Sequence, residues 1–232
     1  MFRKKYYPEN PEAVDDPFQA SISDLMASLL SIFILAFIYY ILNFQQATAQ
    51  LSENQSKRTE ILLAVQRELK QKDVDAIIDI EHGVLRLPEG VLFDTGEARL
   101  KESGIATAGI LGPILENVLN RPEFADSVDT IFIEGHTDDL PIHTALFSSN
   151  WELSTQRAIN TFHALTDAAT GLKQFTNSKR EPVLSCSGYA DTRPLQPNTT
   201  EKNRRENRRI DFRFSMTPPT EDDAGILRPA NR

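Results

Sequence analysis

The hydrophobic and polar positions divide the chain into one apolar segment near its start and a longer mixed remainder. Residues 25–44 carry no charge, and their clearly polar members are Ser28, Ser31 and Asn43. At a rise of about 1.5 Å per residue, a helix of this length spans about 30 Å, the thickness of the hydrocarbon core of a bilayer. The pattern predicts one transmembrane helix over residues 21–44, with a tail of residues 1–20 before it.

A cleaved signal peptide is the alternative for this segment. Residues 3–5 are basic, and Ala47-Thr48-Ala49 fits the small-residue pattern that precedes cleavage. However, the apolar run is longer than the roughly 7–15 residues of the apolar region in a signal peptide. Acidic residues also precede it, namely Glu9, Glu12, Asp15, Asp16 and Asp24. We therefore expect an uncleaved anchor, and N-terminal sequencing of the mature chain would distinguish the two. The basic residues at its two ends favour a cytoplasmic N-terminus only slightly.

The next segment, residues 45–75, has a helix-forming composition without Gly or Pro. Within it Ile61, Leu62, Val65 and Leu69 form an apolar stripe at helical spacing. The stripe is too short to identify a coiled coil. We expect a helical stalk, which a second copy of the chain could pair with.

Residues 76–216 read as an α+β domain in the order β-α-β-α-β-β, a sandwich of a sheet and helices on one of its faces. Alternation is clearest in residues 209–214, where Ile210, Phe212 and Phe214 share one side. One helix is expected over about residues 100–119, kinked or divided by Pro113. Another is expected to begin at Ser149-x-x-Glu152, a capping-box spacing. The other strand candidates are residues 83–87, 130–135 and 183–188, and residues 217–232 are expected to be disordered.

Composition narrows the function classes. The chain has 232 residues and a formal net charge of −8, which argues against a nucleic-acid partner. The basic run Lys202, Arg204, Arg205, Arg208 and Arg209 is the exception, and we interpret it as solvated charges at a strand start plus one ligand contact. The single cysteine, Cys186, excludes an intrachain disulfide and a Cys-based zinc site.

Five motifs occur in order in the C-terminal part: "LFDTGEARL" (92–100), "IEGHTDDLP" (133–141), "NWELSTQRA" (150–158), "SGYADTRP" (187–194) and "NRRENRRIDF" (203–212). Together they resemble the OmpA-like peptidoglycan-binding family, over roughly residues 83–214. The wording of the second and third motifs is most similar to the MotB branch, the stator B subunits of ion-driven motors. One departure is Asn203-Arg204, where the family usually has Gly-Arg.

This resemblance implies a site for diaminopimelate, whose side-chain end carries an ammonium and a carboxylate. Asp138 would take the ammonium, and Arg157 would grip the carboxylate with its planar fork. Further residues at matching positions are Thr137, Asn150, Leu153 and Arg208. The plainer alternative is that Asp138 and Arg157 form a structural salt bridge.

Enzyme and metal functions have weaker support. His136, Asp138, Asp139 and His143 could be imagined as metal ligands, but the family motif treats the histidine as structural and no second cluster completes a site. No arrangement of nucleophile and base is evident. We expect a protein that is not an enzyme and has neither cofactor nor metal.

The resemblance extends to "DLMASLLSIF" in the apolar segment, because MotB-like proteins carry an ion-carrying aspartate there. That residue is Asp24, and Ala27, Ser28 and Ser31 share its helical face. A charged carboxylate at membrane depth is costly and usually functional. The alternative is local: Ser21-x-x-Asp24 is itself a capping-box spacing, so Asp24 could only cap the helix.

The resemblance implies a single-pass protein of the bacterial inner membrane, with the C-terminal domain in the periplasm. Its implied partners are a ring of MotA-like multi-helix subunits, a second copy of itself and peptidoglycan. The short, acidic N-terminal tail is most similar to ZorB of the Zorya anti-phage defence systems, whose ring subunit is ZorA. A flagellar MotB-like subunit and a passive membrane-to-wall tether are the alternatives. Protons are favoured over sodium only as the commoner ion.

Overall fold

The computed structural model describes residues 17–124 and 126–218 in two units. One unit contains the chain up to Thr48, and the other extends from Ala49 to Thr220. The expectations for the first sixteen residues and for most of the C-terminal tail fall outside the described residues.

The first unit is the apolar part of helix α1, which extends as one helix over Pro17–Gln71. Its large apolar side chains are exposed, from Leu25 to Phe44. Within the described part of the chain, α1 is the one helix long and apolar enough to cross a membrane. The expected apolar helix is thereby confirmed, whereas its insertion in a membrane remains a prediction.

The start of α1 contradicts the capping interpretation of Asp24. The helix begins at Pro17, so Ser21 and Asp24 lie inside it and not at its end. Proline is well suited to a first helical position because its φ is already helical and its missing N–H would have no partner there. The spacing of Ser21 and Asp24 therefore did not mark a helix start.

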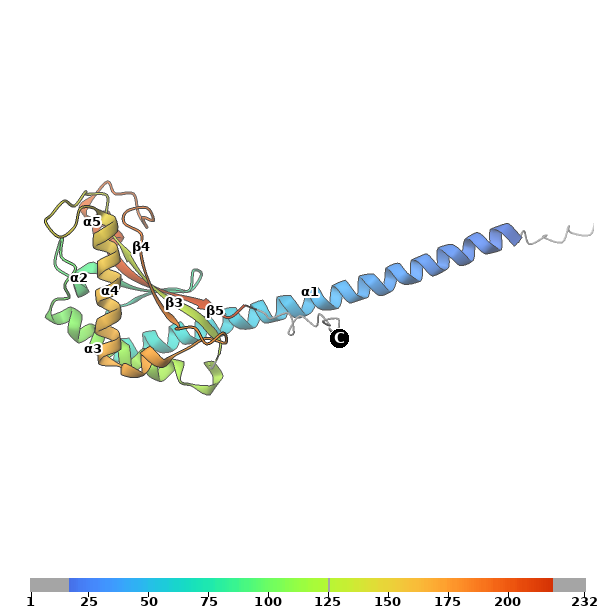
Figure 1. The fold of residues 1–232 in the computed structure, drawn as a ribbon, viewed down its shortest axis with the longest axis horizontal. Helices are drawn as coiled ribbons and strands as arrows, with labels where there is room; N and C mark the ends of the chain where they lie inside the picture. Colours follow the sequence, from blue (N-terminus) through green and yellow to red (C-terminus); the bar gives the residue numbers. More distant parts are fainter. Residues whose placement is uncertain (1–16, 125, 219–232) are drawn as a thin grey trace, which may run out of the picture. The chain divides into compact units, whose positions relative to one another are not determined.

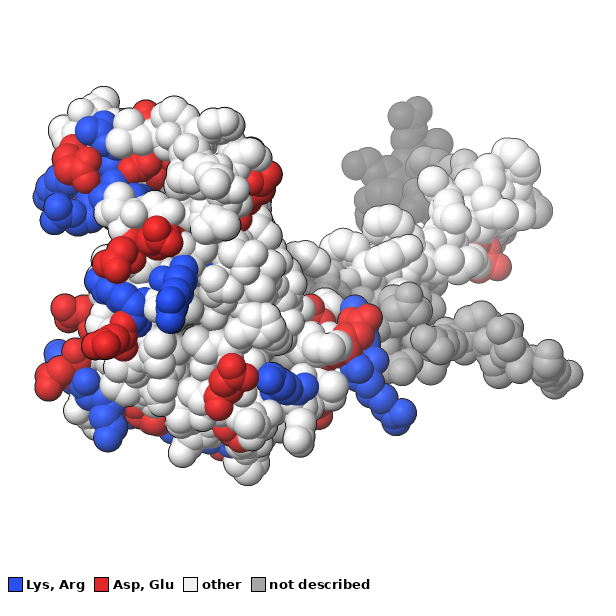
Figure 2. Space-filling view, turned by 60° about the vertical axis from the view of Figure 1, so that its left-hand side comes forward, with Lys and Arg blue, Asp and Glu red and all other residues white. Residues whose placement is uncertain are grey.

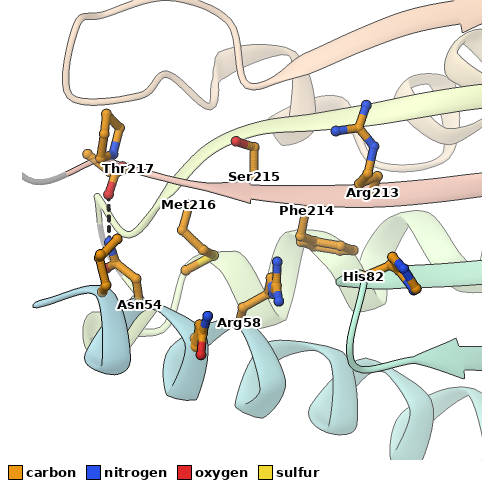
Figure 3. A pocket seen from close by; sticks show the side chains of 11 residues that line it. Asn54, Arg58, His82, Arg213, Phe214, Ser215, Met216 and Thr217 are labelled. Atoms are coloured by element: carbon orange, nitrogen blue, oxygen red, sulfur yellow. Dashed lines mark hydrogen bonds between the residues drawn. The ribbon is translucent and has the colours of Figure 1, made fainter. Parts of the chain in front are cut away.

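In the second unit, the remainder of α1 packs on the domain. Ile61, Leu62, Val65 and Leu69 are fully buried in the hydrophobic core, so the apolar stripe of the expected stalk faces the domain. One turn earlier the packing is open. A cavity of about 360 Å³ lies between α1 and the end of β5. One hydrogen bond joins its two sides, because Asn54 Nδ2 on α1 donates to the Thr217 carbonyl oxygen at 2.8 Å (Figure 3).

The sheet has five strands in the order β1-β2-β5-β3-β4. Strands β3 and β4 are parallel and the other pairs antiparallel. The bounds are β1 Ile77–Asp79, β2 Val84–Pro88, β3 Val128–His136, β4 Leu184–Gly188 and β5 Arg209–Met216. All four expected strands are present, and each end lies within two residues of the expected one. The short strand β1 was not expected.

Helices α3 (Glu102–Leu119) and α4 (Asn150–Ala168) cover the same face of the sheet as the end of α1 (Figure 1). The expected division of α3 is wrong, because the helix continues through Pro113. Since a proline costs one backbone hydrogen bond and not a whole turn, burial of Leu111, Ile114 and Leu115 against the core outweighs it. Short elements complete the domain: α2 Glu89–Leu92, α5 Glu201–Asn207, and the 3₁₀ turns η1 Pro122–Phe124 and η2 Thr170–Gln174.

The other face of the sheet carries charges, and several of them are buried. Arg209 is 4% exposed, and its Nε donates to Asp211 Oδ2 at 2.9 Å. Asp211 accepts at its other oxygen from Arg86 Nε on the neighbouring strand, at 2.8 Å. The interpretation of Arg209 as a solvated charge is therefore wrong, because a carboxylate compensates it inside the fold. Figure 2 shows one face of the molecule, on which acidic and basic side chains are interspersed without one large basic patch.

The crossing of α4 over β3 positions the functional part of the domain. At Gly135 a Cβ atom would collide with the backbone carbonyl of Ser154 on α4. We predict that Gly135→Ala destabilises a fragment of residues 49–220 by about 2–3 kcal/mol, because backbone atoms cannot move aside as a flexible side chain can. Urea denaturation measures the change.

Gly109→Ala is the matched control. Gly109 lies in α3 with open space where its Cβ would be, so alanine should stabilise the helix by about 0.5–1 kcal/mol. Equal effects of the two substitutions would contradict the proposed close contact.

Candidate functional site

A cavity of about 190 Å³ lies where the end of β3, the start of α4, α2 and the start of β5 meet. We call it the β3–α4 pocket. All six residues that the sequence singled out for ligand binding line it: Thr137, Asp138, Asn150, Leu153, Arg157 and Arg208. They come from three separate motifs, and the fold brings them together.

The segment after β3 is held by local hydrogen bonds. Asn150 Nδ2 donates to the carbonyl oxygens of Asp138, at 3.2 Å, and Leu140, at 3.0 Å. The Thr137 hydroxyl donates to the same Asp138 carbonyl at 2.9 Å. The Asp138 carboxylate accepts from the Leu140 backbone N–H at 3.1 Å. Asn150 and Thr137 therefore shape the pocket by fixing the backbone that presents Asp138.

The start of α4 differs in detail from the expected capping box. Ser149 is the N-cap residue, but its side chain makes no capping hydrogen bond. Glu152 instead accepts from both the backbone N–H and the hydroxyl of Ser148, each at 2.6 Å. Glu152 thus binds Ser148, one residue before the Ser149 that the capping-box spacing predicted.

Arg157 is the most deeply placed charge of the pocket, at 2% exposure. Its Nε donates to the Glu97 carbonyl oxygen at 2.8 Å, and its guanidinium lies 5.2 Å from the centre of the Phe93 ring. Its Nη2 forms an ion pair with Glu89. Burial lowers the pKa of Arg157, and the negative charge of Glu89 opposes that shift.

Asp138 and Arg157 do not pair with each other. Asp138 pairs with Arg208 Nη1, and Arg208 Nε lies 2.7 Å from Glu89 Oε2. The carboxylate of Glu89 thus joins the two arginines, and the order of contacts is Arg157, Glu89, Arg208, Asp138. Burial lowers the pKa of Arg208, but hydrogen bonds to Glu201 and Asp138 outweigh it and raise the pKa overall.

Glu89 was not identified from the sequence. It stands in "LPEGVLF", just before the first motif, and there it reads as a surface acid in a turn. Its burial, at 6% exposure, follows from the pairing of β2 with β5, which places it beside Arg208. The backbone N–H of Glu89 donates to the Arg208 carbonyl oxygen at 3.0 Å. A contact between residues so distant in the chain leaves no local signal.

The pocket has the groups to hold a small zwitterion. A carboxylate, Asp138, and a guanidinium, Arg157, both line one small cavity, so an ammonium and a carboxylate of one ligand could be bound together. The described residues contain no group of three or more His, Cys, Asp or Glu side chains placed to hold an ion.

His136 is the last residue of β3 and is 2% exposed. Its ring stacks on Tyr189, with 5.4 Å between centroids, and it lies 3.8 Å from Asp211. Burial and the nearby charge of Arg209 lower the pKa of His136 from 6.5 to about 3. The residue is thus a neutral, packed side chain at neutral pH, as expected of a structural histidine.

The chain resembles known proteins in sequence and in fold. The model of the OmpA family matches residues 92–208, about half of the chain. The chain belongs to the OmpA family. Motility protein B of Bacillus subtilis (strain 168) is 31% identical over 129 residues, which cover 55% of this chain and 43% of that protein. The YtxE protein of the same strain is 35% identical over 137 residues, which cover 59% of this chain and 50% of YtxE.

Among solved structures, a MotB-like protein from Desulfovibrio vulgaris is 25% identical, with a TM-score of 0.52. The match covers 76% of this chain and 96% of that one. This chain spans about half the length of the two Bacillus relatives, so the similarity concerns mainly the OmpA family domain. That domain contains every residue of the β3–α4 pocket except Glu89.

The second predicted site lies in the apolar part of α1. Asp24, Ala27, Ser28 and Ser31 are all exposed on this helix, at a spacing that places them on one face. The Ser31 hydroxyl donates to the Ala27 carbonyl oxygen at 2.8 Å. The Ser31 hydroxyl is thus satisfied within the helix, and Asp24 remains the charged group of that face.

The low pKa of His136 predicts how stability depends on pH. Below pH 6.5 the unfolded chain binds a proton at this residue, whereas the folded chain stays neutral down to about pH 3. The contribution of His136 to stability is therefore lost progressively as the pH falls from 6.5 toward 3. Between pH 7 and pH 5 this loss amounts to about 2 kcal/mol.

Urea denaturation of residues 49–220 at both pH values, with His136→Gln as the comparison, isolates this effect because other titrating groups cancel in the difference. The variant should lose about 2 kcal/mol less than the natural chain on acidification. Parallel losses would show that His136 titrates normally in the fold.

Proposed function

We propose that the OmpA family domain binds peptidoglycan through the β3–α4 pocket, with a diaminopimelate side chain as the bound group. The observation that carries the proposal is that Asp138 and Arg157, charges of opposite sign, line one small cavity. The free end of diaminopimelate presents an ammonium and a carboxylate on a single carbon. A guanidinium recognises a carboxylate by paired hydrogen bonds, and a carboxylate recognises an ammonium by charge.

Binding to purified sacculi tests this function. We predict that Asp138→Asn weakens sacculus binding at least tenfold, since it removes the charge that faces the ammonium, and that Arg157→Ala abolishes binding. The measurement is co-sedimentation with diaminopimelate-containing sacculi, with circular dichroism to verify folding. Asp139→Asn is the matched control, because the neighbouring aspartate is exposed and does not line the pocket. If Asp138→Asn bound as well as Asp139→Asn, the assigned ligand site would be wrong.

We further infer that the chain is the B subunit of an ion-driven motor in the bacterial inner membrane. The support is the combination of an apolar helix with an OmpA family domain and the similarity to motility protein B. In this proposal the N-terminus is cytoplasmic, the domain lies in the periplasm, a second copy pairs with the chain, and a MotA-like ring surrounds the helices. The four acidic residues before residue 17 favour a ZorB-like subunit of a Zorya defence system, with a ZorA-like ring, over a flagellar one. A neighbouring nuclease or helicase gene would support the defence role.

Asp24 is the proposed ion carrier, with protons as the favoured ion. Its position at the start of the uncharged run of residues 25–44 supports this role, because a carboxylate at membrane depth is costly and is usually functional. Ala27 and Ser28 on the same face are small enough for close helix packing or a narrow wet path.

We predict that Asp24→Asn abolishes ion flux through the co-purified complex while leaving assembly intact, because the amide cannot exchange a proton. Flux in proteoliposomes is the measurement, in proton and in sodium gradients. Asp24→Glu is the matched control and should retain part of the flux. A passive tether would retain full function in cells with Asp24→Asn.

A further inference from the structure

The carboxylate-binding position of the β3–α4 pocket is already filled by a side chain of the protein. Glu89 Oε1 pairs with Arg157 Nη2, and Glu89 Oε2 lies 2.7 Å from Arg208 Nε. We propose that Glu89 is an internal competitor for the ligand carboxylate and so determines which wall chemistries the pocket accepts. This inference rests on the proposed peptidoglycan function, which it deepens by assigning a specificity-determining residue.

Arg208 is surrounded by carboxylates. Its Nε lies 2.7 Å from Glu89 Oε2 without a hydrogen bond, its Nη1 pairs with Asp138, and its Nη2 donates to Glu201 at 2.9 Å. A ligand carboxylate that approaches Arg208 therefore meets the negative charge of these three side chains.

Arg157 is similarly constrained. At 2% exposure it cannot turn toward a ligand without breaking its bonds to the backbone carbonyls of Glu97 and Asp94. A carboxylate that binds Arg157 in its present orientation therefore competes for the position of Glu89. The competition is direct, because both groups need the same N–H donors.

The formal charges that line the pocket balance, because Glu89 and Asp138 stand against Arg157 and Arg208. A free ligand carboxylate therefore finds no surplus positive charge while Glu89 is in place, and it must displace Glu89 to reach Arg157. A ligand whose carboxylate is amidated needs no such displacement.

Glu89 can withdraw by side-chain rotation alone. Its backbone is anchored, since its N–H donates to the Arg208 carbonyl oxygen at 3.0 Å. The cavity beside it is bordered by Thr95 and Gly96, so the side chain can swing within the pocket while α2 stays in place. Displacement then requires no change in the fold.

A purely positioning role is the alternative for Glu89. In that case the carboxylate would only hold Arg157 in its rotamer, and its removal would weaken every ligand equally. The two roles differ in their dependence on the ligand. Competition affects only ligands with a free carboxylate, whereas loss of positioning affects ligands of both kinds.

The experiment uses two stem tetrapeptides of sequence L-Ala–D-Glu–meso-diaminopimelate–D-Ala. In one the side-chain carboxylate of diaminopimelate is free, and in the other it is amidated. Calorimetry measures the affinity of both for the full chain in detergent, as the natural sequence, as Glu89→Gln and as Glu134→Gln. The last is the matched control, because Glu134 is an equally buried acid that pairs with Arg213 on the charged face of the sheet.

We expect the natural chain to discriminate less than threefold between the two tetrapeptides. Glu89→Gln should bind the free-carboxylate form at least tenfold more tightly than the natural chain does and change the amidated form by less than threefold. Glu134→Gln should leave both affinities within twofold of the natural chain.

Two results would overturn the proposal while leaving the peptidoglycan function standing. One is a Glu89→Gln chain that binds both peptides more weakly or unchanged. The other needs no variant: a natural chain that already prefers the free carboxylate more than tenfold would show that Glu89 does not compete. A natural chain that binds neither peptide nor sacculi would instead refute the proposed function itself, together with this inference.

Discussion

The arrangement of the candidate site depends on how closely α4 approaches β3. Gly135 on β3 and Gly188 on β4 carry no side chain at the places where Ser154 and Thr155 of α4 pass over these strands. The Ser154 hydroxyl also accepts from the Ala190 backbone N–H at 3.1 Å. Because the helix rests on the strand backbone itself, its first turns lie at a set height above the end of β3. Arg157 and Asp138 face one cavity as a result.

The second constraint is charge compensation in a domain that buries several ionised groups. A buried arginine without a carboxylate would cost several kcal/mol, and each buried arginine here has one. In the pocket the compensation comes from Glu89 and Asp138, and on the far face of the sheet it comes from Asp211. Binding in the pocket would therefore be an exchange of partners, because a ligand charge enters where a protein charge already stands.

Much of the fold was predictable because its signals are local. Period-2 alternation located β5, the helical stripe of Ile61, Leu62 and Val65 located the docked part of α1, and the motifs named six residues that line one cavity. The predictions that were wrong or missing concerned contacts between distant residues, or depended on the balance of opposing energies. Burial outweighed Pro113 in α3, pairing of β2 with β5 buried Glu89, and the earlier start of α1 removed Asp24 from any cap. The periodicity of apolar residues does not indicate which acidic residue will pair with which arginine.

Arg208 and Arg209 show how finely that pairing is set. They are adjacent in sequence, yet Arg208 faces the pocket and Arg209 faces Asp211 on the opposite side. The residue before them, Asn207, is fully buried, and its side chain accepts from the backbone N–H groups of Leu195 and Gln196 and donates to Gln196 and Asn198. Because successive strand residues alternate faces, a shift by one position would exchange the two arginines. The buried amide of Asn207 pins the junction between α5 and β5, and it thereby decides which arginine reaches Glu89 and Asp138.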